Sequence, residues 1–484
     1  MNKLIEKINN LSQGYDVYAV GGFVRDLYLN CKNGDIDLVV NKEPLKYAKK
    51  LAKFFKAKLI TLDKVSETYR IILKDNKIKN IDISRFCANT IEEDLQSRDF
   101  TVNAIAFNLK DFKNFKQHVI LSKKTALKDL KAKILNPVSS KSFKTDALRM
   151  LRGFRFMAEH SFKISESSLK QIKSKAKLIS DVSKERVKNE FSRILATNNA
   201  AKVLKMMDKA GLLDAVFPEI VKMKKGSKKY YYHKGGLFEH SFKTFESSEN
   251  ILSNLKKYFP QNYIDLQKRF KDNFSFSENV TREGLIKFVA LFHDNAKPET
   301  ASFENGKMHF FGHEEKGAQK IKGIMSALKF SKKDIEFSVF LVRHHMRLST
   351  LTRDNIVTKK ASLKLFRDIG DFISELLVVS MSDWHSYKNL KVFSKSKLNL
   401  QEQSLRELVR YYYELKNAKP LEKIIDGNVI MKKFSLKPGP IIGELLKNVL
   451  IAQEEGKVTN VKEALEFVSL KLTQIKKKDK ICRY

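Results

Sequence analysis

VYAVGGFVRDLYLNCKNGDIDLVV, residues 17–40, predicts a short strand, a tight turn, a helix and a second strand. The first strand is apolar, the turn falls at Gly21–Gly22, and the helix is expected to begin near Val24. The second strand carries Asp35 and Asp37. Because a strand rises about 3.3 Å per residue and alternates its faces, these two carboxylates point the same way, roughly 6.6 Å apart. The stretch therefore predicts an α/β unit with an acidic face.

This acidic face predicts a particular chemistry. Two carboxylates suit Mg²⁺, which binds one or two carboxylates together with phosphate oxygens and water. The paired glycines let the backbone approach a ligand, and their N–H groups can cradle a phosphate. The combination predicts a site for a nucleoside triphosphate on a metal ion. Taken alone, a D-x-D pair is also typical of a solvated strand end.

Length and composition limit the class of protein. A chain of 484 residues predicts about three domains, and 42% hydrophobic residues exclude global disorder. No apolar run approaches the roughly 20 residues that span a bilayer, so no membrane partner is expected. The N-terminal segment lacks the apolar core of a signal peptide. The three cysteines have neither metal nor disulfide spacing. These features predict a cytoplasmic protein.

The charge of the chain predicts its kind of partner. Lysine and arginine number 93 against 55 acidic residues, which gives a formal net charge of +38. Such an excess favours a polyanion, and nucleic acid is the first candidate because phosphate contacts release counterions. A lysine-rich composition imposed by an A+T-biased genome would give the same balance.

The first part of the chain continues the α/β pattern. Residues 1–120 alternate strands and helices, with further strands expected over 57–62, 69–73 and 80–84. Asp82 lies in the middle of the last of these strands, where a carboxylate is costly unless it is paired or coordinates a cation. It is either a third acidic residue of the site or a hydrogen-bonded residue of an edge strand.

A second motif, SRDFTVNA, occupies residues 97–104. With GG-x-VRD and GDID before it, this order resembles the head domain of the tRNA nucleotidyltransferase (CCA-adding enzyme) and bacterial poly(A) polymerase family, class II, in the DNA polymerase β-like superfamily. Ser97 replaces the first arginine of the family's R-R-D. The resemblance implies that Asp35 and Asp37 are catalytic and hold two Mg²⁺ ions. It also implies that Arg98 and Asp99 hold the sugar. It implies that the nucleotide is bound by Gly21, Gly22, Arg25, Arg98 and Asp99.

From about residue 121 the pattern becomes helical, and TDALRMLRGFRF carries a third motif. Asp146, Arg149, Arg152 and Arg155 recur every three residues, which predicts one shared helix face. The family's motif here is E-D-x-x-R, with Thr145 in place of the glutamate.

By this resemblance, Asp146 and Arg149 recognise the incoming base. Cytosine and adenine each present an amino donor beside a ring-nitrogen acceptor, which suits a carboxylate that accepts and a guanidinium that donates. An ordinary helical ion pair is the alternative. Arg152 and Arg155 either contact the triphosphate or are solvated.

Histidines gather between residues 233 and 385. A His-Asp doublet with flanking histidines and a distant aspartate resembles the HD metal-dependent phosphohydrolase superfamily, and imidazole with carboxylate suits Mn²⁺, Ni²⁺, Fe²⁺ or Zn²⁺. H-D-N-A-K replaces the usual H-D-I-G-K, so a tRNA-binding scaffold without catalysis is the alternative. The resemblance assigns one ion to His240, His293, Asp294 and Asp383, a second to His313 and His345, and a phosphate to Lys297.

The expected fold is a multidomain α/β and all-α protein. It comprises a polymerase β-like nucleotidyltransferase head with a mixed sheet, a helical neck and body, a helical HD domain, and a helical C-terminal tail that binds tRNA. The expected boundaries are 1–120, 121–222, 223–400 and 401–484.

The resemblance implies addition or repair of the 3′-terminal CCA of tRNA from CTP and ATP. The short connection after residue 85 favours a CC-adding enzyme as one alternative, and a poly(A) polymerase is another. A phosphohydrolase acting on 2′,3′-cyclic or 2′-phosphate RNA ends is a third. A non-catalytic RNA-binding protein is disfavoured, because it would not need all the acidic residues of the three motifs.

Overall fold

The computed structural model describes residues 2–481 except 32–33, 75–77, 87, 227–232, 274–275, 352–357, 389, 391–393 and 419–420. Cys87 and Cys482 lie outside the described residues. The chain divides into two compact units. The first comprises 1–225, 276–284 and 323–334, and the second comprises 226–275, 285–322 and 335–484.

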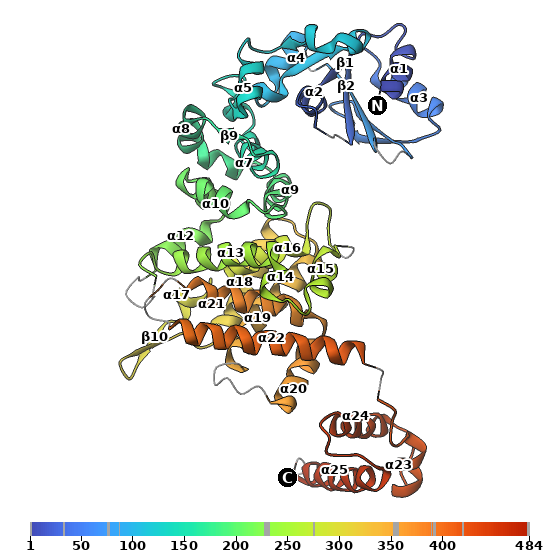
Figure 1. The fold of residues 1–484 in the computed structure, drawn as a ribbon, viewed down its shortest axis with the longest axis vertical. Helices are drawn as coiled ribbons and strands as arrows, with labels where there is room; N and C mark the ends of the chain where they lie inside the picture. The colour runs from blue at the N-terminus through green and yellow to red at the C-terminus, as the bar shows by residue number, and fades with distance from the viewer. Residues whose placement is uncertain are drawn as a thin grey trace. The chain divides into compact units, whose positions relative to one another are not determined.

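A seven-stranded mixed sheet forms the head (Figure 1), in the order β3-β4-β5-β2-β1-β6-β7. β2 and β5 pair in parallel, and the other neighbours pair antiparallel. The strands expected from the sequence are confirmed to within one or two residues, and so is the α/β class of the head. The bounds are β1 (Val17–Val20), β2 (Asp35–Val40), β3 (Lys58–Asp63), β4 (Thr68–Ile72), β5 (Asn80–Arg85), β6 (Ile105–Asn108) and β7 (Ile120–Leu121).

Alternation at the start of β2 and along β5 gives this part of the sheet one apolar and one polar face. Ile36 and Ile81 are fully buried, while their neighbours along each strand are polar. The helix after β1 begins at Gly21 and not near Val24 as expected. Gly21 takes a positive φ of 67°, which turns the chain from the strand into the helix without a connecting loop. The head helices are α1 (Asn2–Asn10), α2 (Gly21–Tyr28), α3 (Pro44–Phe54), α4 (Ile91–Ser97), η1 (Thr101–Asn103) and η2 (Leu109–Gln117).

The chain after the head is helical, as the sequence predicts. α7 packs against both α9 and α10 and buries Leu151 and Phe154 completely. The elements of this segment are α5 (Ala126–Ala132), β8 (Ile134–Leu135), α6 (Ser142–Thr145), α7 (Leu148–His160), β9 (Lys163–Ile164), α8 (Glu166–Lys175), η3 (Ala176–Asp181), α9 (Lys184–Leu195), α10 (Ala200–Lys209), α11 (Leu212–Val216) and α12 (Pro218–Lys225).

Helices dominate residues 237–417, apart from one small hairpin. α21 is apolar on nearly all sides and is buried between α13 and α22, which is the position that such a helix requires. No helix in the described part of the chain is long and apolar enough to cross a membrane. The elements are α13 (Leu237–Ser253), α14 (Leu255–Tyr258), α15 (Tyr263–Lys271), α16 (Arg282–Phe292), α17 (Lys297–Thr300), β10 (Ser302–Glu304), β11 (Lys307–His309), α18 (His313–Ala327), α19 (Lys332–Leu351), α20 (Lys359–Ile369), η4 (Gly370–Phe372), α21 (Ile373–Ser386) and α22 (Lys395–Asn417).

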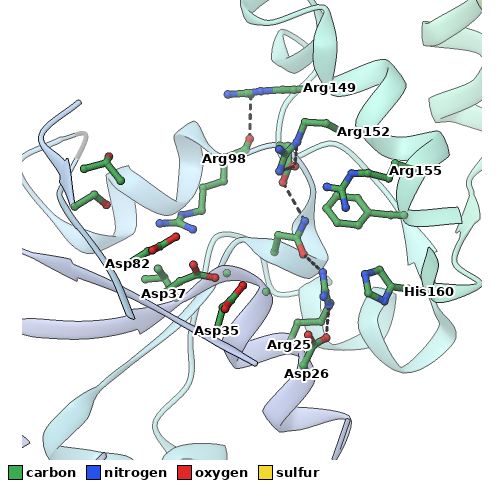
Figure 2. A pocket seen from close by; sticks show the side chains of 18 of the residues that line it. Arg25, Asp26, Asp35, Asp37, Asp82, Arg98, Arg149, Arg152, Arg155 and His160 are labelled. Carbon is green, nitrogen blue, oxygen red and sulfur yellow. Dashed lines mark hydrogen bonds and ion pairs between the residues drawn. The ribbon is translucent and has the colours of Figure 1, made fainter. Parts of the chain in front are cut away.

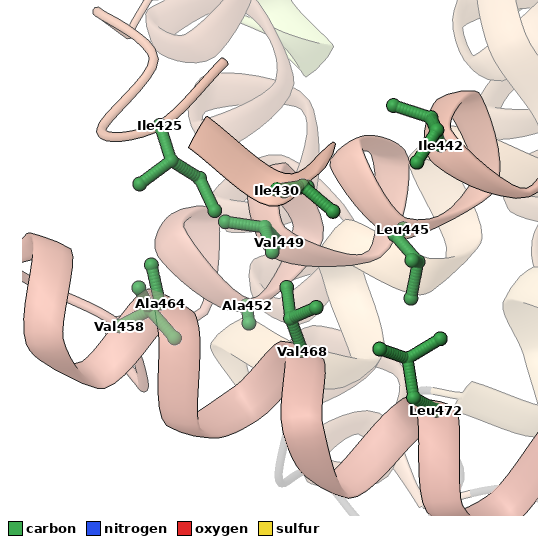
Figure 3. Close-up of a cluster of buried hydrophobic side chains, with 10 residues drawn as sticks. All are labelled: Ile425, Ile430, Ile442, Leu445, Val449, Ala452, Val458, Ala464, Val468 and Leu472. Carbon is green, nitrogen blue, oxygen red and sulfur yellow. The ribbon is translucent and has the colours of Figure 1, made fainter. Parts of the chain in front are cut away.

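Three helices near the C-terminus enclose an apolar cluster of their own (Figure 3). They are α23 (Gly427–Phe434), α24 (Pro440–Glu454) and α25 (Val461–Ile481), and each contributes to a core that includes Ile430, Leu445 and Val468. The Asp426 carboxylate caps α23 by accepting from the Val429 N–H at 2.9 Å. Pro438 and Gly439 lie between α23 and α24, and Pro440 begins α24.

Candidate active site and metal centre

Three carboxylates lie side by side on the polar face of the head sheet (Figure 2). Asp35 and Asp37 come from β2, and the parallel register places Asp82 of β5 beside Asp37. The Asn80 side chain donates to Asp35 Oδ1 at 2.9 Å. All three acids line one cavity of about 770 Å³. Asp82 belongs to an interior strand, not to an edge strand, and it is also hydrogen-bonded by Arg70, so its part in the site stays a prediction.

The environment of Asp37 favours a cation. Burial and the charges of Asp82 and Asp35 raise its pKa to about 6, although Arg98 and the Phe23 N–H act in the opposite direction. Crowded carboxylate oxygens in a polar cavity are the ligands that a hard divalent cation prefers. The donor set therefore fits a metal held by Asp35 and Asp37.

The glycine pair brings the start of α2 close to these carboxylates. An added Cβ on Gly21 would lie 3.1 Å from Arg98 Nη1 and 3.8 Å from Asp37 Oδ2. At Gly22 the nearest atoms would be Arg25 Nη2 at 3.7 Å and Asp37 Oδ2 at 3.8 Å. Gly21 thus needs glycine both for its positive φ and for space.

We expect Gly21→Ala to impair the site more than the matched change Gly22→Ala. Alanine at position 21 would be strained by about 1 kcal/mol and would push against the Arg98 guanidinium. Position 22 has ordinary van der Waals space for a Cβ. Thermal unfolding and the affinity for nucleotide measured on both variants check this. Equal behaviour of the two variants would contradict it.

A chain of hydrogen bonds connects Arg25 to Asp99. Arg25 Nη1 donates to Asn103 Oδ1 at 2.8 Å, and Asn103 Nδ2 donates to Asp99 Oδ1 at 3.2 Å. Arg152 Nε donates to Asp99 Oδ2 at 2.9 Å. Burial alone would raise the pKa of Asp99, but the Arg152 charge and the hydrogen bonds from the Phe100 N–H, Arg152 and Asn103 together outweigh it, and the pKa is lowered. Asp99 is thus an ionised acceptor facing the cavity.

The side chains of Arg98 and Asp99 point to different parts of the cavity. Its Nη2 donates to Asp94 Oδ2 at 3.0 Å, and its Nη1 lies against Gly21. Figure 2 shows it beside Asp37 and Asp82. Arg98 therefore lies at the carboxylates, and Asp99 faces the neck helices.

Asp146 lies just before α7, outside the helix, with an extended backbone (φ −145°, ψ 105°). Its Oδ1 accepts from the Leu148 N–H at 3.1 Å, and its Oδ2 accepts from Arg186 Nη2 at 2.9 Å. The prediction of one helix face for the whole motif is therefore wrong for its first residue. Arg149 lies within α7 and donates to the carbonyl oxygens of Ser97 at 2.7 Å and Arg98 at 3.1 Å.

The last arginine of the motif is not solvated. Arg155 is 4% exposed, and it donates to Glu190 at 2.5 Å and to Glu159 at 2.6 Å. Arg152 shares Glu190 at 3.8 Å, so both arginines are paired with carboxylates at the cavity wall. For Arg155 the solvated alternative is wrong.

Some residues at and beside the cavity carried no recognised sequence signal. Arg186 lines the cavity and Glu190 pairs with the lining residue Arg155; both belong to KERVKNE, a segment whose helical pattern predicts only packing. Their spacing of four residues on α9 is the signal that could have pointed to a charged helix face. Arg70 of β4 and His160 at the end of α7 also line the cavity.

A second cluster lies within residues 240–383. The Nε2 atom of His240 is 3.2 Å from Asp294 Oδ2 and 3.2 Å from Asp383 Oδ1. His293 Nε2 is 3.2 Å from Asp294 Oδ2 and 3.8 Å from Asp383 Oδ1. The structure thus brings together the four residues assigned to a first ion, although they come from α13, the end of α16, and α21.

The residues assigned to a second ion lie on the other side of Asp294. Its Oδ1 is 3.4 Å from His313 Nε2 and 3.6 Å from His345 Nε2, and these two nitrogens are 3.3 Å apart. Lys297, which the sequence assigned to a phosphate, has its Nζ 2.5 Å from Asp294 Oδ2.

The tautomers of these histidines suit metal binding. The Nδ1 atoms of His293, His313 and His345 lie 3.0, 2.7 and 2.6 Å from backbone carbonyl oxygens. Each Nδ1 therefore carries the proton, which leaves the Nε2 lone pair directed into the cluster. Among the described residues, ligand atoms lie within 4.8 Å of one another in two groups, His240–His293–Asp383 and His293–Asp294–His345. This donor set fits a transition metal.

Comparison with known families matches three segments of the chain. The model of the Poly A polymerase head domain matches residues 17–136, and the model of the RNA and SrmB binding site of polymerase A matches residues 161–223. The model of tRNA nucleotidyltransferase domain 2 matches residues 315–468. With the acidic site on a mixed sheet, these matches define the protein as a nucleotidyltransferase.

Similar proteins extend over nearly the whole chain. The CC-adding tRNA nucleotidyltransferase of Thermus thermophilus is 27% identical over 94% of this chain and 93% of its own length. The A-adding tRNA nucleotidyltransferase of Deinococcus radiodurans is 26% identical over 93% of this chain and 94% of its own. Along nearly its whole length the chain is therefore similar to tRNA nucleotidyltransferases, and its head is similar to that of the poly(A) polymerases; nucleotidyltransferases of this kind use a divalent metal.

The fold agrees with a solved member of the family. The structure of the Thermotoga maritima CCA-adding enzyme complexed with tRNA covers 98% of this chain and 96% of its own, with a TM-score of 0.61 at 22% identity. This likeness confirms the expected architecture, a mixed α/β head followed by a mostly helical body.

Proposed function

We propose that this protein builds or repairs the 3′-terminal CCA of tRNA from CTP and ATP. The observation that carries the proposal is that one cavity joins the three carboxylates, ionised Asp99, and the Asp146–Arg149 pair. A nucleotide with its phosphates at the carboxylates would reach Asp99 with its sugar and Asp146 with its base. Relatives named for addition of CC, of A, and of CCA support the reaction class.

Asp35 and Asp37 would hold Mg²⁺, which would neutralise charge on the phosphates and activate the attacking hydroxyl. Asp99 would accept a hydrogen bond from a ribose hydroxyl, and it is held ready by Arg152 and Asn103. Because Arg152 keeps Asp99 ionised, this acceptor needs no rearrangement when the nucleotide binds.

Base choice would rest on Asp146 and Arg149. Each Asp146 oxygen already accepts one hydrogen bond and keeps a lone pair for the base amino group. Arg149 is oriented by the Ser97 and Arg98 carbonyl oxygens and retains N–H donors for the ring nitrogen. Uracil and guanine present the reverse pattern and would leave these charged groups unpaired.

The partners and the domains follow the same proposal. The net charge of +38 supports binding of tRNA along the chain. We assign the head to 1–120, the neck and body to 121–222, the HD domain to 223–400, and a tRNA-binding tail to 401–484. We also propose that the protein acts in the cytoplasm, where tRNA is processed.

The test is extension of a tRNA that ends at its discriminator base, read at single-nucleotide resolution. CTP, ATP or both would be supplied, and UTP and GTP would serve as controls. Addition of C, C and A in order is expected. A protein that extends no tRNA with any nucleotide would refute the proposal.

A CC-adding enzyme is the second candidate. β5 ends at Arg85 and α4 begins at Ile91, so the connection between them is short. The family resemblance associates a short connection with enzymes that stop after two cytidines, and the Thermus thermophilus relative bears that name. A product that stops at CC when both CTP and ATP are present would decide for this candidate.

We propose a further phosphohydrolase activity on 2′,3′-cyclic or 2′-phosphate RNA ends at the histidine–aspartate cluster. The converging Nε2 atoms of four buried histidines around Asp294 support it, since a bound cation would satisfy all of these ligand atoms at once. Mn²⁺, Ni²⁺, Fe²⁺ or Zn²⁺ held there would activate water against a phosphate ester.

We expect Asp294→Asn to separate the two activities. Asparagine removes the charge that all four histidines face, so metal content should fall at least about tenfold and phosphohydrolase activity should be lost. CC or CCA addition should stay unchanged, because its carboxylates lie in the head. Metal analysis and both assays on one preparation check this. A matched change at the exposed Asp368 should alter neither metal content nor activity.

A further inference from the structure

The polar face of the head sheet extends beyond the carboxylates onto β4. Thr68, Arg70, Asp82 and Ser84 line the same cavity as Asp37. The register pairs Asp37 with Asp82 and Asp82 with Arg70, so one row of side chains crosses three neighbouring strands. Thr68 lies two residues before Arg70 on β4, and Ser84 lies two residues after Asp82 on β5. Because β4 and β5 are antiparallel, Thr68 and Ser84 lie on the same side of this row.

Arg70 binds Asp82 through two of its three guanidinium nitrogens. Its Nε donates to Asp82 Oδ1 at 2.8 Å and its Nη2 donates to Asp82 Oδ2 at 2.7 Å. The side chain is 32% exposed, and Asp82 is 19% exposed. Because a guanidinium has five N–H donors, the Nη1 donors can bind an anion while Asp82 stays in place.

Strand order shows which substrate would meet Arg70. β1, which leads into Gly21, adjoins β2 on one side, and β5 and β4 follow β2 on the other. Asp99 and Arg149, assigned above to the nucleotide, lie on the β1 side of β2. Asp99 belongs to the segment that leads into β6, the other neighbour of β1, and Arg149 donates to the Arg98 carbonyl oxygen of the same segment. In phosphoryl transfer the attacking and leaving oxygens lie roughly in line, on opposite sides of the phosphorus. The attacking hydroxyl therefore arrives over β5 and β4.

Arg70 is the cavity-lining cation on that side. Among the described residues that line the cavity, no other lysine or arginine comes from β4 or β5. An acceptor RNA that presents its 3′-hydroxyl to Asp35 and Asp37 must bring its last phosphodiester close to three carboxylates. A cation beside them offsets that repulsion.

We propose that Arg70 binds the phosphodiester nearest the 3′-hydroxyl of the acceptor RNA, with the Thr68 and Ser84 hydroxyls as further donors to the same strand. The inference rests on the proposed nucleotidyl transfer and assigns the site of its second substrate. Asp82 then acts as a positioning residue, which holds the guanidinium plane. A purely structural cross-strand ion pair would have no preference for charge on the RNA.

The test compares two acceptors with two proteins. The acceptor is a tRNA minihelix whose last linkage is either natural or an uncharged methylphosphonate, and the proteins are the wild type and Arg70→Gln. In the wild type the neutral linkage should raise the KM for the acceptor about tenfold. In Arg70→Gln the two acceptors should have the same KM, and the KM for CTP should stay within about twofold of wild type. Full discrimination between the acceptors in Arg70→Gln would overturn the proposal.

Arg85→Gln is the matched control. Arg85 belongs to the neighbouring strand β5 and, like Arg70, pairs with a carboxylate, here Glu67 at 3.4 Å. Its side chain is 58% exposed and does not line the cavity. It should discriminate between the acceptors as the wild type does.

Arg70→Lys keeps the positive charge and covers the case in which the glutamine variant does not fold. Arg70→Lys should retain part of the KM difference between the natural and the neutral acceptor. A lysine variant with the same KM for both acceptors would count against a charge contact. A wild type that extends neither acceptor would refute the nucleotidyl transfer itself. If the protein extends the acceptors but the neutral linkage and the Arg70→Gln substitution raise the KM for the acceptor independently of each other, only the role of Arg70 is refuted.

Discussion

Asp35→Asn and Asp37→Asn should each lower nucleotide addition by on the order of 10³-fold, with the fold intact. In the proposed function these two side chains of β2 would hold the divalent metal, and an amide oxygen is a neutral, weaker ligand. Single-turnover extension of tRNA in saturating CTP and Mg²⁺ measures the effect. Addition within tenfold of wild type would contradict the assignment of the metal to this pair.

The same change at Asp37 should stabilise the metal-free protein. Burial and repulsion raise the pKa of Asp37 from 3.8 to about 6, so its ionised form is disfavoured in the folded state. Asp37→Asn should therefore raise the free energy of unfolding at pH 7 by on the order of 1–2 kcal/mol, less than the whole shift because the side chain is partly exposed.

The pH dependence of that gain has a definite sign. Below about pH 4 the carboxyl is protonated in both states and the substitution gains nothing. Between pH 4 and 6 the gain grows, and above pH 6 it is complete. Denaturant unfolding in EDTA across this range measures it. A variant that is less stable than wild type at pH 7 would show that Asp37 is stabilised by its neighbours.

Asp146→Ala should have the second-largest effect. Removing the acceptor leaves the base amino group unpaired, so kcat/KM for both CTP and ATP should fall about 10²-fold. UTP and GTP should gain relative to them, because the carboxylate no longer opposes their acceptor atoms. Competition among the four nucleotides at a single addition step checks both parts of this expectation.

Two neighbours serve as controls for Asp146. Arg186→Gln removes a donor to Asp146 Oδ2 but keeps the carboxylate, so its loss of base choice should be intermediate. Thr145→Ala changes an exposed residue that donates only to the Lys141 carbonyl oxygen and should behave as wild type. An unaltered base preference in Asp146→Ala would remove this residue from base recognition.

Sequence patterns predicted most of the local structure around the site. Alternation along β2 placed Asp35 and Asp37 on the polar face and Ile36 in the core, whereas α2 begins at the glycine pair and not near Val24 as predicted. The separate histidine and aspartate motifs predicted a cluster that the structure brings together from several helices. The errors concern Asp146, which precedes its helix, and Arg155, which is buried. The period of three residues was taken for one shared helix face, and solvation was one of the two alternatives left open for Arg155.

By itself, the sequence determined the classes of element, the polar face of the sheet, and the motifs that identify the family. These features depend on the alternation of side chains along a strand and on the freedom of glycine at positive φ, which act within a few residues. Only the tertiary structure decided which charges meet. Arg70 pairs with Asp82, Arg186 with Asp146, and Arg155 with Glu190. Such pairs depend on strand register and helix packing between distant segments, because the energy of a charge in a partly buried cavity is set by its neighbours in space.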